Sequence, residues 1–230
     1  MKRIAVLTGA GMSAESGLKT FRDSGGLWEN YDVMEVASIE GWERNPALMQ
    51  RFYNERRHQL WDVRPNKGHV GLVDLESKFH VDIVTQNVDN LHEVAGSRHV
   101  LHLHGELTKV RSSIDSQLIY ELGPNDKDVM MGDLCDKGSQ LRPHIVWFGE
   151  AVPMLDKAIE IVSKADIVLV IGTSLSVYPA ASLIHYASAN TSLYLIDPNK
   201  PDNLPNRVIY IKASASEGVS IFNSEIMSRK

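Results

Sequence analysis

Short apolar runs recur along the chain, separated by polar, glycine-rich or amphipathic stretches. The run Ile-Val-Leu-Val-Ile at 167–171 is apolar at every position, which is typical of a central parallel strand covered by helices on both faces. Runs of this kind, bounded by turn residues, predict buried strands. The predicted strands are Ile4–Leu7, Val81–Thr85, Val100–Leu103, Ile145–Phe148, Ile167–Ile171, Leu193–Ile196 and Val208–Ile211.

Helical patterns lie between these runs. Pro153 begins one, in which the apolar positions share a stripe. These positions are Leu155, Ala158, Ile159 and Val162. Asn45 is a candidate cap for another helix, which has Pro46 in its first turn and runs to about Leu60. Strands that alternate with helices predict the α/β class, here a doubly wound, Rossmann-like parallel sheet.

Two regions interrupt this alternation. Residues 20–75 lack a clear strand and carry aromatic and charged helical patterns. Residues 105–142 are polar, with turn signals at 123–126 and 132–133. We interpret residues 1–230 as a single domain in which these regions form a helical lid and a small inserted subdomain.

Composition and charge narrow the class of protein. With 43% apolar and 23% charged residues, the chain is typical of a globular protein. Its net charge of −5 argues against a nucleic-acid partner, which would require a basic face. Cys135 is the single cysteine, so no intramolecular disulfide can form. The apolar run after Arg3 is too short for a signal peptide, and no run has the roughly 18 residues of a membrane span. We therefore predict a cytoplasmic protein with no membrane partner; its oligomeric state stays open.

The first predicted strand leads into a glycine-rich loop that matches G-x-G-x-x-[G/A]. In dinucleotide-binding folds such glycines let the backbone approach a pyrophosphate, and a following helix offers free N–H groups. The candidate residues are Gly9, Ala10, Gly11, Ser13 and Ala14. A plain strand-to-helix turn is the alternative. A dehydrogenase-type fold should reach its second strand, with an acidic ribose-binding residue, about 20 positions on; here that distance falls in residues 22–29, which read as a loop, and this argues against hydride transfer.

A second such turn, Gly172-Thr173-Ser174, follows the predicted central strand. Small and hydroxyl residues there suit phosphate or ribose contacts at the carboxyl edge of the sheet, although a helix cap explains them equally well.

Two histidines also stand out. His102 and His104 alternate with Leu101 and Leu103, so both imidazoles are expected on one strand face. Such a pair is usually structural or part of a metal site, and no third ligand lies nearby in the sequence.

Longer motifs extend over nearly the whole chain and resemble the sirtuin family. They occupy residues 9–17, 20–23, 26–28, 85–92, 102–107, 142–150, 172–180 and 196–199. The resemblance implies an NAD-consuming deacylase. In that reaction the acyl-lysine oxygen attacks the nicotinamide-bearing ribose carbon of NAD, and the products are nicotinamide, free lysine and O-acyl-ADP-ribose.

By this resemblance His104 is the base that activates ribose hydroxyls after nicotinamide departs, a role that suits an imidazole titrating near neutral pH. Asn87 is assigned to catalysis with it. Gln86, Asn87 and Asp89 resemble the nicotinamide and ribose pocket, because amides and carboxylates can hydrogen-bond a carboxamide and sugar hydroxyls. A turn that satisfies its own backbone is the alternative.

The resemblance completes the expected binding residues. The predicted NAD-binding residues are Gly9, Ala10, Gly11, Ser13, Ala14, Phe21, Arg22, Gln86, Asn87, Asp89, His104, Gly172, Thr173, Ser174, Asn199 and Ala213. The groove where the acyl-lysine peptide of a protein substrate would pair as an added strand contains Val146, Phe148, Gly149 and Val177.

Tyr53 and Arg56 lie i, i+3 on a predicted helix and share a face. The pair resembles the Tyr-x-x-Arg of sirtuins that remove succinyl or malonyl groups, because a guanidinium and a hydroxyl can both donate to a carboxylate. We expect desuccinylase and demalonylase activity besides deacetylation. A solvated helix face is the alternative.

Many sirtuins hold a structural zinc with two Cys-x-x-Cys pairs in the small subdomain. Here these positions are Ser112 and Asp115, then Cys135 and Gly138, so one of four thiolates remains. Structural zinc takes four protein ligands, and we predict no metal in this degenerate zinc-ribbon-like subdomain.

Two other functions remain open on the same scaffold. One is ADP-ribosyl transfer to another nucleophile, and the other is an inactive module that binds ADP-ribose or acyl-lysine. The presence of Asn87, Asp89 and His104 together argues against the inactive module.

Overall fold

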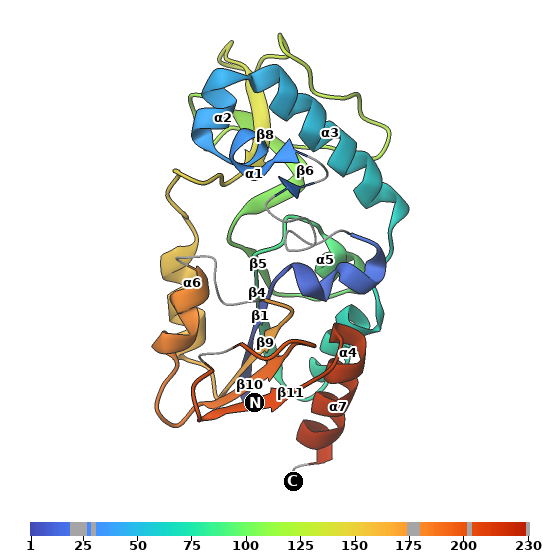
Figure 1. The fold of residues 1–230 in the computed structure, drawn as a ribbon, viewed down its shortest axis with the longest axis vertical. Helices are drawn as coiled ribbons and strands as arrows, with labels where there is room; N and C mark the ends of the chain where they lie inside the picture. The colour runs from blue at the N-terminus through green and yellow to red at the C-terminus, as the bar shows by residue number, and fades with distance from the viewer. Residues whose placement is uncertain (19–26, 29–30, 174–179, 202–203, 229–230) are drawn as a thin grey trace.

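The computed structural model describes residues 1–18, 27–28, 31–173, 180–201 and 204–228. A six-stranded sheet with helices on both sides forms the lower part of the molecule in Figure 1. A smaller group of helices and strands forms the upper part, and both chain ends lie near the bottom.

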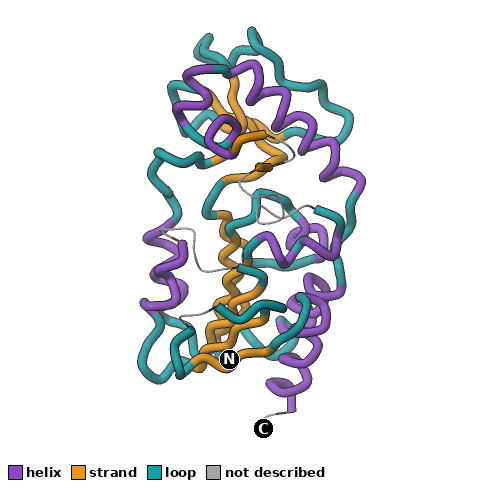
Figure 2. The backbone as a smooth tube through the Cα atoms, viewed as in Figure 1, coloured by secondary structure: helices purple, strands orange, loops and turns teal. Residues whose placement is uncertain are grey.

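The main sheet is parallel throughout. Its strands are β1 (Arg3–Thr8), β4 (His80–Thr85), β5 (Val100–His102), β9 (Ile167–Ile171), β10 (Ser192–Ile196) and β11 (Val208–Ile211). They follow the order β11-β10-β9-β1-β4-β5, and each overlaps a strand predicted from the sequence. The chain order reverses between β1 and β9, where sheets of this type bind ligands outside the carboxyl ends of the strands. The predicted doubly wound α/β fold is confirmed (Figure 2).

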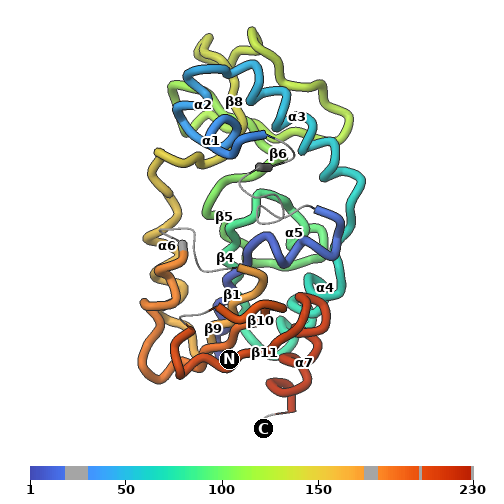
Figure 3. Tube along the Cα trace, viewed as in Figure 1, coloured from blue at the N-terminus to red at the C-terminus, as the bar shows by residue number. Residues whose placement is uncertain are grey.

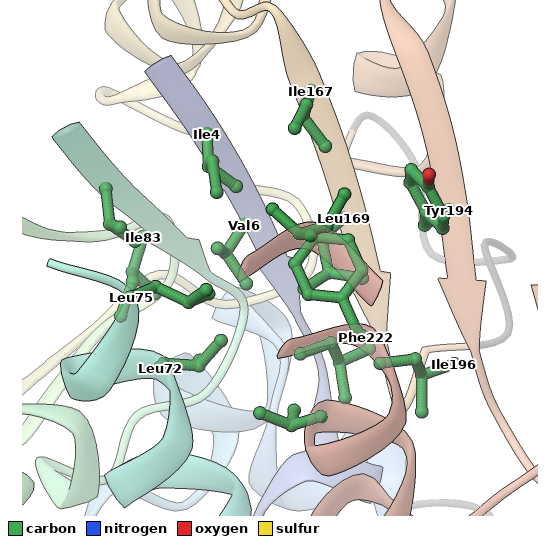
Figure 4. Close-up of a cluster of buried hydrophobic side chains, with 14 of the residues drawn as sticks. Ile4, Val6, Leu72, Leu75, Ile83, Ile167, Leu169, Tyr194, Ile196 and Phe222 are labelled. Carbon is green, nitrogen blue, oxygen red and sulfur yellow. The ribbon is translucent and has the colours of Figure 1, made fainter. Parts of the chain in front are cut away.

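One face of this sheet is covered by α4 (Lys67–Leu75) and α7 (Ala215–Ser228). Ile4 and Val6 of β1 lie in the fully buried cluster on this side, with Phe222 of α7 packed among them (Figure 4). Each side chain of this size contributes roughly 1.5–3 kcal/mol when it leaves water.

The opposite face is covered by α6 (Leu155–Ser163) and the 3-10 segment η3 (Ala180–Tyr186). Ala5 and Leu7 of β1 lie in the second buried cluster, on this side. Alternate residues of one strand therefore enter opposite layers, which is why the run is apolar at consecutive positions.

The smaller group combines three helices with two antiparallel sheets. The helices are α1 (Val33–Val36), α2 (Ile39–Arg44) and α3 (Pro46–Asp62). The sheets pair β2 (Leu27–Trp28) with β3 (Tyr31–Asp32), and β6 (Gly105–Ser112) with both β7 (Ile119–Glu121) and β8 (Leu141–Ile145). Chain segments far apart in sequence thus lie side by side in this part of the molecule (Figure 3).

Two predictions about this part are wrong. The expected strand Ile145–Phe148 is replaced by β8, which ends at Ile145, and the N–H groups of Trp147 and Phe148 are bound outside the sheet. The Trp147 N–H donates to the Glu150 carboxylate, and the Phe148 N–H donates to the Ala37 carbonyl. Residues 20–75 were expected to lack strands but contain β2 and β3, which are too short to produce a periodic pattern.

Helix α3 begins as predicted, with the Asn45 side chain accepting a hydrogen bond from the Leu48 N–H. One stripe of this helix is hydrogen-bonded to the inserted subdomain. Asn54 donates to the Val129 carbonyl at 3.0 Å and accepts from its N–H at 3.3 Å, and Arg57 donates to the Leu107 carbonyl at 2.9 Å. These bonds fix polar backbone groups that would otherwise be buried without partners.

Among the described residues, no helix combines the length and the apolar character that crossing a membrane would need.

Candidate active site

The glycine-rich loop after β1 lies directly against the turn after β9. The Gly9 N–H donates to the Ile171 carbonyl at 3.0 Å, and the Gly11 N–H donates to the Gly172 carbonyl at 2.9 Å. A Cβ on Gly11 would lie 2.7 Å from the Cα of Gly172, and a Cβ on Gly172, where φ is +60°, would lie 2.4 Å from the Met12 nitrogen. The glycines are therefore required by the contact between the two loops, a reason that the motif alone did not reveal.

The α-helix predicted after this loop is wrong. The chain forms two 3-10 turns, η1 (Ala10–Met12) and η2 (Ala14–Ser16), and ends them at Gly17 with φ of +98°. The loop packs against the rest of the protein through Asn66, whose side-chain amide donates a hydrogen bond to the Met12 carbonyl at 2.8 Å.

The loop after β4 joins the same site through three polar side chains. The Asn87 amide donates to Ser13 Oγ at 3.2 Å, and Ser13 Oγ donates to the Asp89 carboxylate at 2.9 Å. Asp89 is buried, and burial raises the pKa of its carboxyl, although hydrogen bonds from Leu91 and Ser13 partly offset this. The structure thus brings Ser13, from one predicted motif, together with Asn87 and Asp89, from another.

Gln86 connects this loop to the other two. Its side-chain amide donates to Thr173 Oγ1 at 3.3 Å, and its backbone N–H donates to the Thr8 carbonyl at 2.9 Å. Loops from β1, β4 and β9, adjacent strands of the sheet, therefore meet at the point where the chain order reverses. A nucleotide bound there would contact all three.

His104 is held over this junction by a carbonyl. Its Nδ1 lies 3.1 Å from the Gln86 oxygen, and because a carbonyl only accepts, Nδ1 carries the hydrogen. Nε2 then has the lone pair of a base. Burial lowers the pKa of His104 below 6.5, while the bond to Gln86 acts in the opposite direction, so the neutral form is favoured at neutral pH.

His102 has a different electrostatic environment. Its Nδ1 lies 3.0 Å from the Asn87 carbonyl oxygen and its Nε2 lies 2.8 Å from the Glu93 carboxylate. Burial opposes the charged imidazole, but Glu93 and the carbonyl outweigh it and raise the pKa of His102 above 6.5. β5 ends at His102, so the alternation of side chains along a strand does not extend to His104. The two imidazoles nevertheless bind the carbonyls of consecutive residues, Asn87 and Gln86.

Tyr53 and Arg56 are buried within the smaller group, so the alternative of a solvated helix face is wrong. Tyr53 Oη accepts from the indole N–H of Trp147 at 2.9 Å, and burial raises the pKa of the phenol. The Arg56 guanidinium lies 5.8 Å from the centre of the Phe52 ring. The Tyr53–Arg56 pair is shielded from water. In this low-dielectric interior its polar groups interact more strongly with an enclosed ligand than they would in water.

The predicted groove residues that the structure describes follow β8. The Val146 N–H donates to the His104 carbonyl at 2.9 Å, so the predicted groove adjoins His104. Phe148 bridges α1 and α2, because its N–H donates to Ala37 and its carbonyl accepts from Ile39. Its backbone is therefore already paired on that side.

The remaining predicted residues are placed at the same edge or lie outside the described residues. Asn199 and Ala213 follow β10 and β11 at their carboxyl ends. Phe21, Arg22, Ser174 and Val177 fall outside the described residues.

Sequence reasoning missed three residues of this site: Asn66, Glu93 and Trp147. Pro65-Asn66 ahead of a helical stretch is a cap signal that could have located the first. Nothing in the sequence pairs Glu93 with His102 or Trp147 with Tyr53, because both contacts join separate elements.

At the expected zinc position a hydrogen-bonded cluster is present. Ser139 Oγ lies 2.8 Å from Ser112 Oγ and 3.1 Å from Cys135 Sγ, and the Lys137 ammonium donates to the Asp115 carboxylate at 2.7 Å. The fourth position is a glycine. One thiol beside a carboxylate already paired with lysine does not fit a four-ligand zinc site. Within the described ranges, no group of three or more metal-binding side chains gathers anywhere.

Comparisons with known proteins agree with this geometry. The family model described as Sir2 family matches residues 9–179. An NAD-dependent protein deacylase of Bacteroides thetaiotaomicron is 57% identical, over 95% of each chain. One from Helicobacter pylori (strain ATCC 700392 / 26695) is 55% identical, over 94% of this chain and 93% of its own.

Two solved structures extend the likeness to the fold. A Sir2 homolog–NAD complex has a TM-score of 0.89 at 36% identity, covering 98% of this chain and 90% of the other. A Sir2–p53 peptide–NAD+ structure has a TM-score of 0.80 at 31% identity, covering 97% and 93%. Since both sequence and fold match over almost the entire length, the chain belongs to the Sir2 family, the sirtuins.

Proposed function

We propose that this protein is an NAD-dependent protein-lysine deacylase that yields free lysine, nicotinamide and O-acyl-ADP-ribose. The observation that carries the proposal is the position of His104, whose Nδ1 is bound to Gln86 at the loop junction and whose backbone carbonyl accepts from Val146 of the predicted groove. Relatives named NAD-dependent protein deacylase support the reaction. Structures containing NAD or a p53 peptide support both substrates.

Each described residue has a specific task in this proposal. NAD supplies an electrophilic ribose carbon with nicotinamide as the leaving group, and the acyl-lysine oxygen displaces it. Asn87 and Asp89, tied together through Ser13, would orient the ribose. His104 Nε2 would then take a proton from a ribose hydroxyl, which attacks the acyl carbon. Protonation of the lysine nitrogen would release free lysine, and addition of one water would leave O-acyl-ADP-ribose. Gln86 holds the other ring nitrogen so that Nε2 remains the base.

The reaction is tested by incubating the protein with NAD and acetyl-, succinyl- and malonyl-lysine peptides and following all products by mass. Free lysine with O-acyl-ADP-ribose is expected, and His104→Ala should abolish both. ADP-ribose attached to protein would instead indicate a transferase, and binding without turnover an inactive module.

We also propose that acidic acyl groups are preferred to acetyl. Tyr53 and Arg56 place a hydroxyl and a guanidinium beside the Phe52 ring, and both groups can donate hydrogen bonds to the terminal carboxylate of an acidic acyl group. Arg56→Met should lower kcat/KM for succinyl-lysine about tenfold or more and leave deacetylation nearly unchanged. Unchanged desuccinylation would refute this preference.

Three further properties belong to the proposal. The chain acts as one catalytic unit, with 20–75 and 105–142 as insertions, and it works in the cytoplasm, where NAD and acylated proteins meet. The subdomain folds without zinc, because hydrogen bonds and the Lys137–Asp115 ion pair occupy the metal position. Elemental analysis of untagged protein, purified without chelators, should give far less than one zinc per chain; a stoichiometric value would refute it.

A further inference from the structure

Trp147 makes the hydrogen bond that determines how the Tyr53 hydroxyl is oriented. An indole N–H can only donate, so Tyr53 Oη is the acceptor in this 2.9 Å contact. The hydroxyl hydrogen must therefore point away from Trp147. Tyr53 is 1% exposed and Trp147 is 2% exposed, so bulk water does not compete for the bond.

The surroundings of Tyr53 make its hydroxyl a selective donor. The ring of Phe52 lies 5.1 Å from that of Tyr53, and the ring of Trp147 lies 6.0 Å away. Arg56, one turn further along α3, is the charged neighbour with the largest electrostatic effect on the phenol. A carboxylate entering this site can accept from a hydroxyl whose hydrogen points away from Trp147, whereas an acetyl methyl group offers no acceptor.

Trp147 itself is held by the ion pair between buried Arg142 and half-buried Glu150. The Arg142 guanidinium lies 3.5 Å from the centre of a Trp147 ring, and it donates to both Glu150 oxygens at 2.8 and 3.0 Å. Glu150 in turn accepts the Trp147 backbone N–H at 2.9 Å. Both the backbone and the ring of Trp147 are thus fixed before substrate arrives, which reduces the entropy lost on binding.

The position of Trp147 in the chain connects the acyl pocket to the catalytic centre. Its neighbour Val146 donates to the His104 carbonyl, and its other neighbour, Phe148, lies in the predicted peptide groove. An acyl-lysine placed along Val146 toward His104 would therefore run close to the Trp147–Tyr53 contact.

We propose that Trp147 is a specificity-determining residue, because it turns the hydroxyl hydrogen of Tyr53 toward the carboxylate of an acidic acyl group. This inference rests on the proposed preference for succinyl and malonyl groups and adds the residue that prepares the pocket for them. Trp147 acts through Tyr53 and is a positioning residue for the substrate.

The test uses the full chain, saturating NAD, and succinyl- and acetyl-lysine peptides of one sequence. Trp147→Phe removes the N–H and keeps an aromatic ring beside Arg142. We expect KM for the succinyl peptide to rise about fivefold, the scale of one hydrogen bond, with KM for the acetyl peptide changed less than about twofold. Trp42→Phe is the matched control, since its ring lies 5.4 Å from that of Trp147 while the bond to Tyr53 comes from Trp147.

Two further variants separate orientation from packing. Tyr53→Phe should cause the same selective loss, and adding Trp147→Phe to it should cause no further loss, because the indole acts through the hydroxyl. If Trp147→Phe folds poorly, 3-benzothienylalanine at position 147 keeps the ring shape and replaces the N–H by sulfur. The selective loss should persist with an unchanged Tm.

The outcomes distinguish the inference from the function it rests on. A wild-type protein that prefers the succinyl peptide, with the preference unchanged in Trp147→Phe, overturns the role of Trp147 alone. Equal losses on both peptides, or additive losses with Tyr53→Phe, also overturn it. A wild-type protein that prefers the acetyl peptide overturns the acidic-acyl preference, and the role of Trp147 with it.

Discussion

His102 and His104 bind the carbonyls of Gln86 and Asn87, yet the two imidazoles carry different charge. His104 meets only a carbonyl on its bonded side, and burial lowers its pKa. His102 faces a carbonyl and the Glu93 carboxylate, both acceptors, so the doubly protonated ring satisfies both. His104 is therefore suited to accept a proton. His102 is suited to hold the loop of Gln86 and Asn87, which in turn orients His104.

The acid side of the pH profile should report His104. Because its pKa lies below 6.5, the neutral base persists as the pH falls through that value, and activity declines only at lower pH. Single-turnover rates of O-acyl-ADP-ribose formation between pH 5 and 8 should show an apparent pKa below 6.5. An apparent pKa well above 6.5 would contradict the burial argument.

Among the elements, α3 has two stripes with different contacts. Tyr53 and Arg56 lie on one, and Asn54 and Arg57 lie on the next, hydrogen-bonded to the inserted subdomain. The subdomain is thus attached to a helix from the other insertion, at backbone groups of Val129 and Leu107.

Removal of the Asn54 amide should destabilise the protein. Asn54→Leu leaves the N–H and carbonyl of buried Val129 without partners, and we expect the free energy of unfolding to fall by about 2–4 kcal/mol. Urea unfolding measures this. Arg51→Ala, at an exposed position of the same helix, is the control and should change stability by less than about 0.5 kcal/mol. Similar values for the two variants would contradict the assigned role.

The contact between the loops after β1 and β9 gives a second prediction at the level of structural elements. Gly11→Ala would place a Cβ 2.7 Å from the Gly172 backbone, which cannot move without disturbing β9. NAD affinity, measured by calorimetry, should fall at least tenfold. Gly123→Ala meets only a side-chain oxygen at 3.6 Å and should retain wild-type affinity; a comparable fall in both would refute the steric explanation.

At the scale of the molecule, the main sheet could be predicted from sequence because its strands are buried on both faces and read as apolar runs. The strands β6, β7 and β8 could not be predicted from the sequence, since polar and apolar residues follow one another along them without a regular period. Motifs located Ser13, His104 and the pair Asn87 and Asp89. The hydrogen bonds that join Ser13 to Asn87 and Asp89 depend on how the sheet brings β1 and β4 together, which the spacing of residues along the chain does not reveal.

Buried histidines should make the whole fold sensitive to acid. Burial lowers the pKa of His69 to about 4 and that of His92 well below 6.5, so the folded state resists protons that the unfolded chain binds near 6.5. The stability that depends on keeping these two histidines neutral is fully present above pH 6.5. It declines as the pH falls toward 4, by on the order of 3 kcal/mol for His69. Urea midpoints at pH 7.5, 6.5 and 5.5 should decrease in that order. The decrease should be smaller in His69→Gln and unchanged in the exposed control His185→Gln; a midpoint independent of pH would contradict it.

The two stripes of α3 have a consequence for how such an enzyme could diversify. Under the proposed acyl preference, substitutions at Tyr53 or Arg56 would alter which acyl groups are accepted, while the neighbouring stripe of Asn54 and Arg57 keeps the subdomain attached. Selection on substrate range and selection on folding then act on different positions of one helix. A lineage could change its acyl preference in a few steps without first losing its fold.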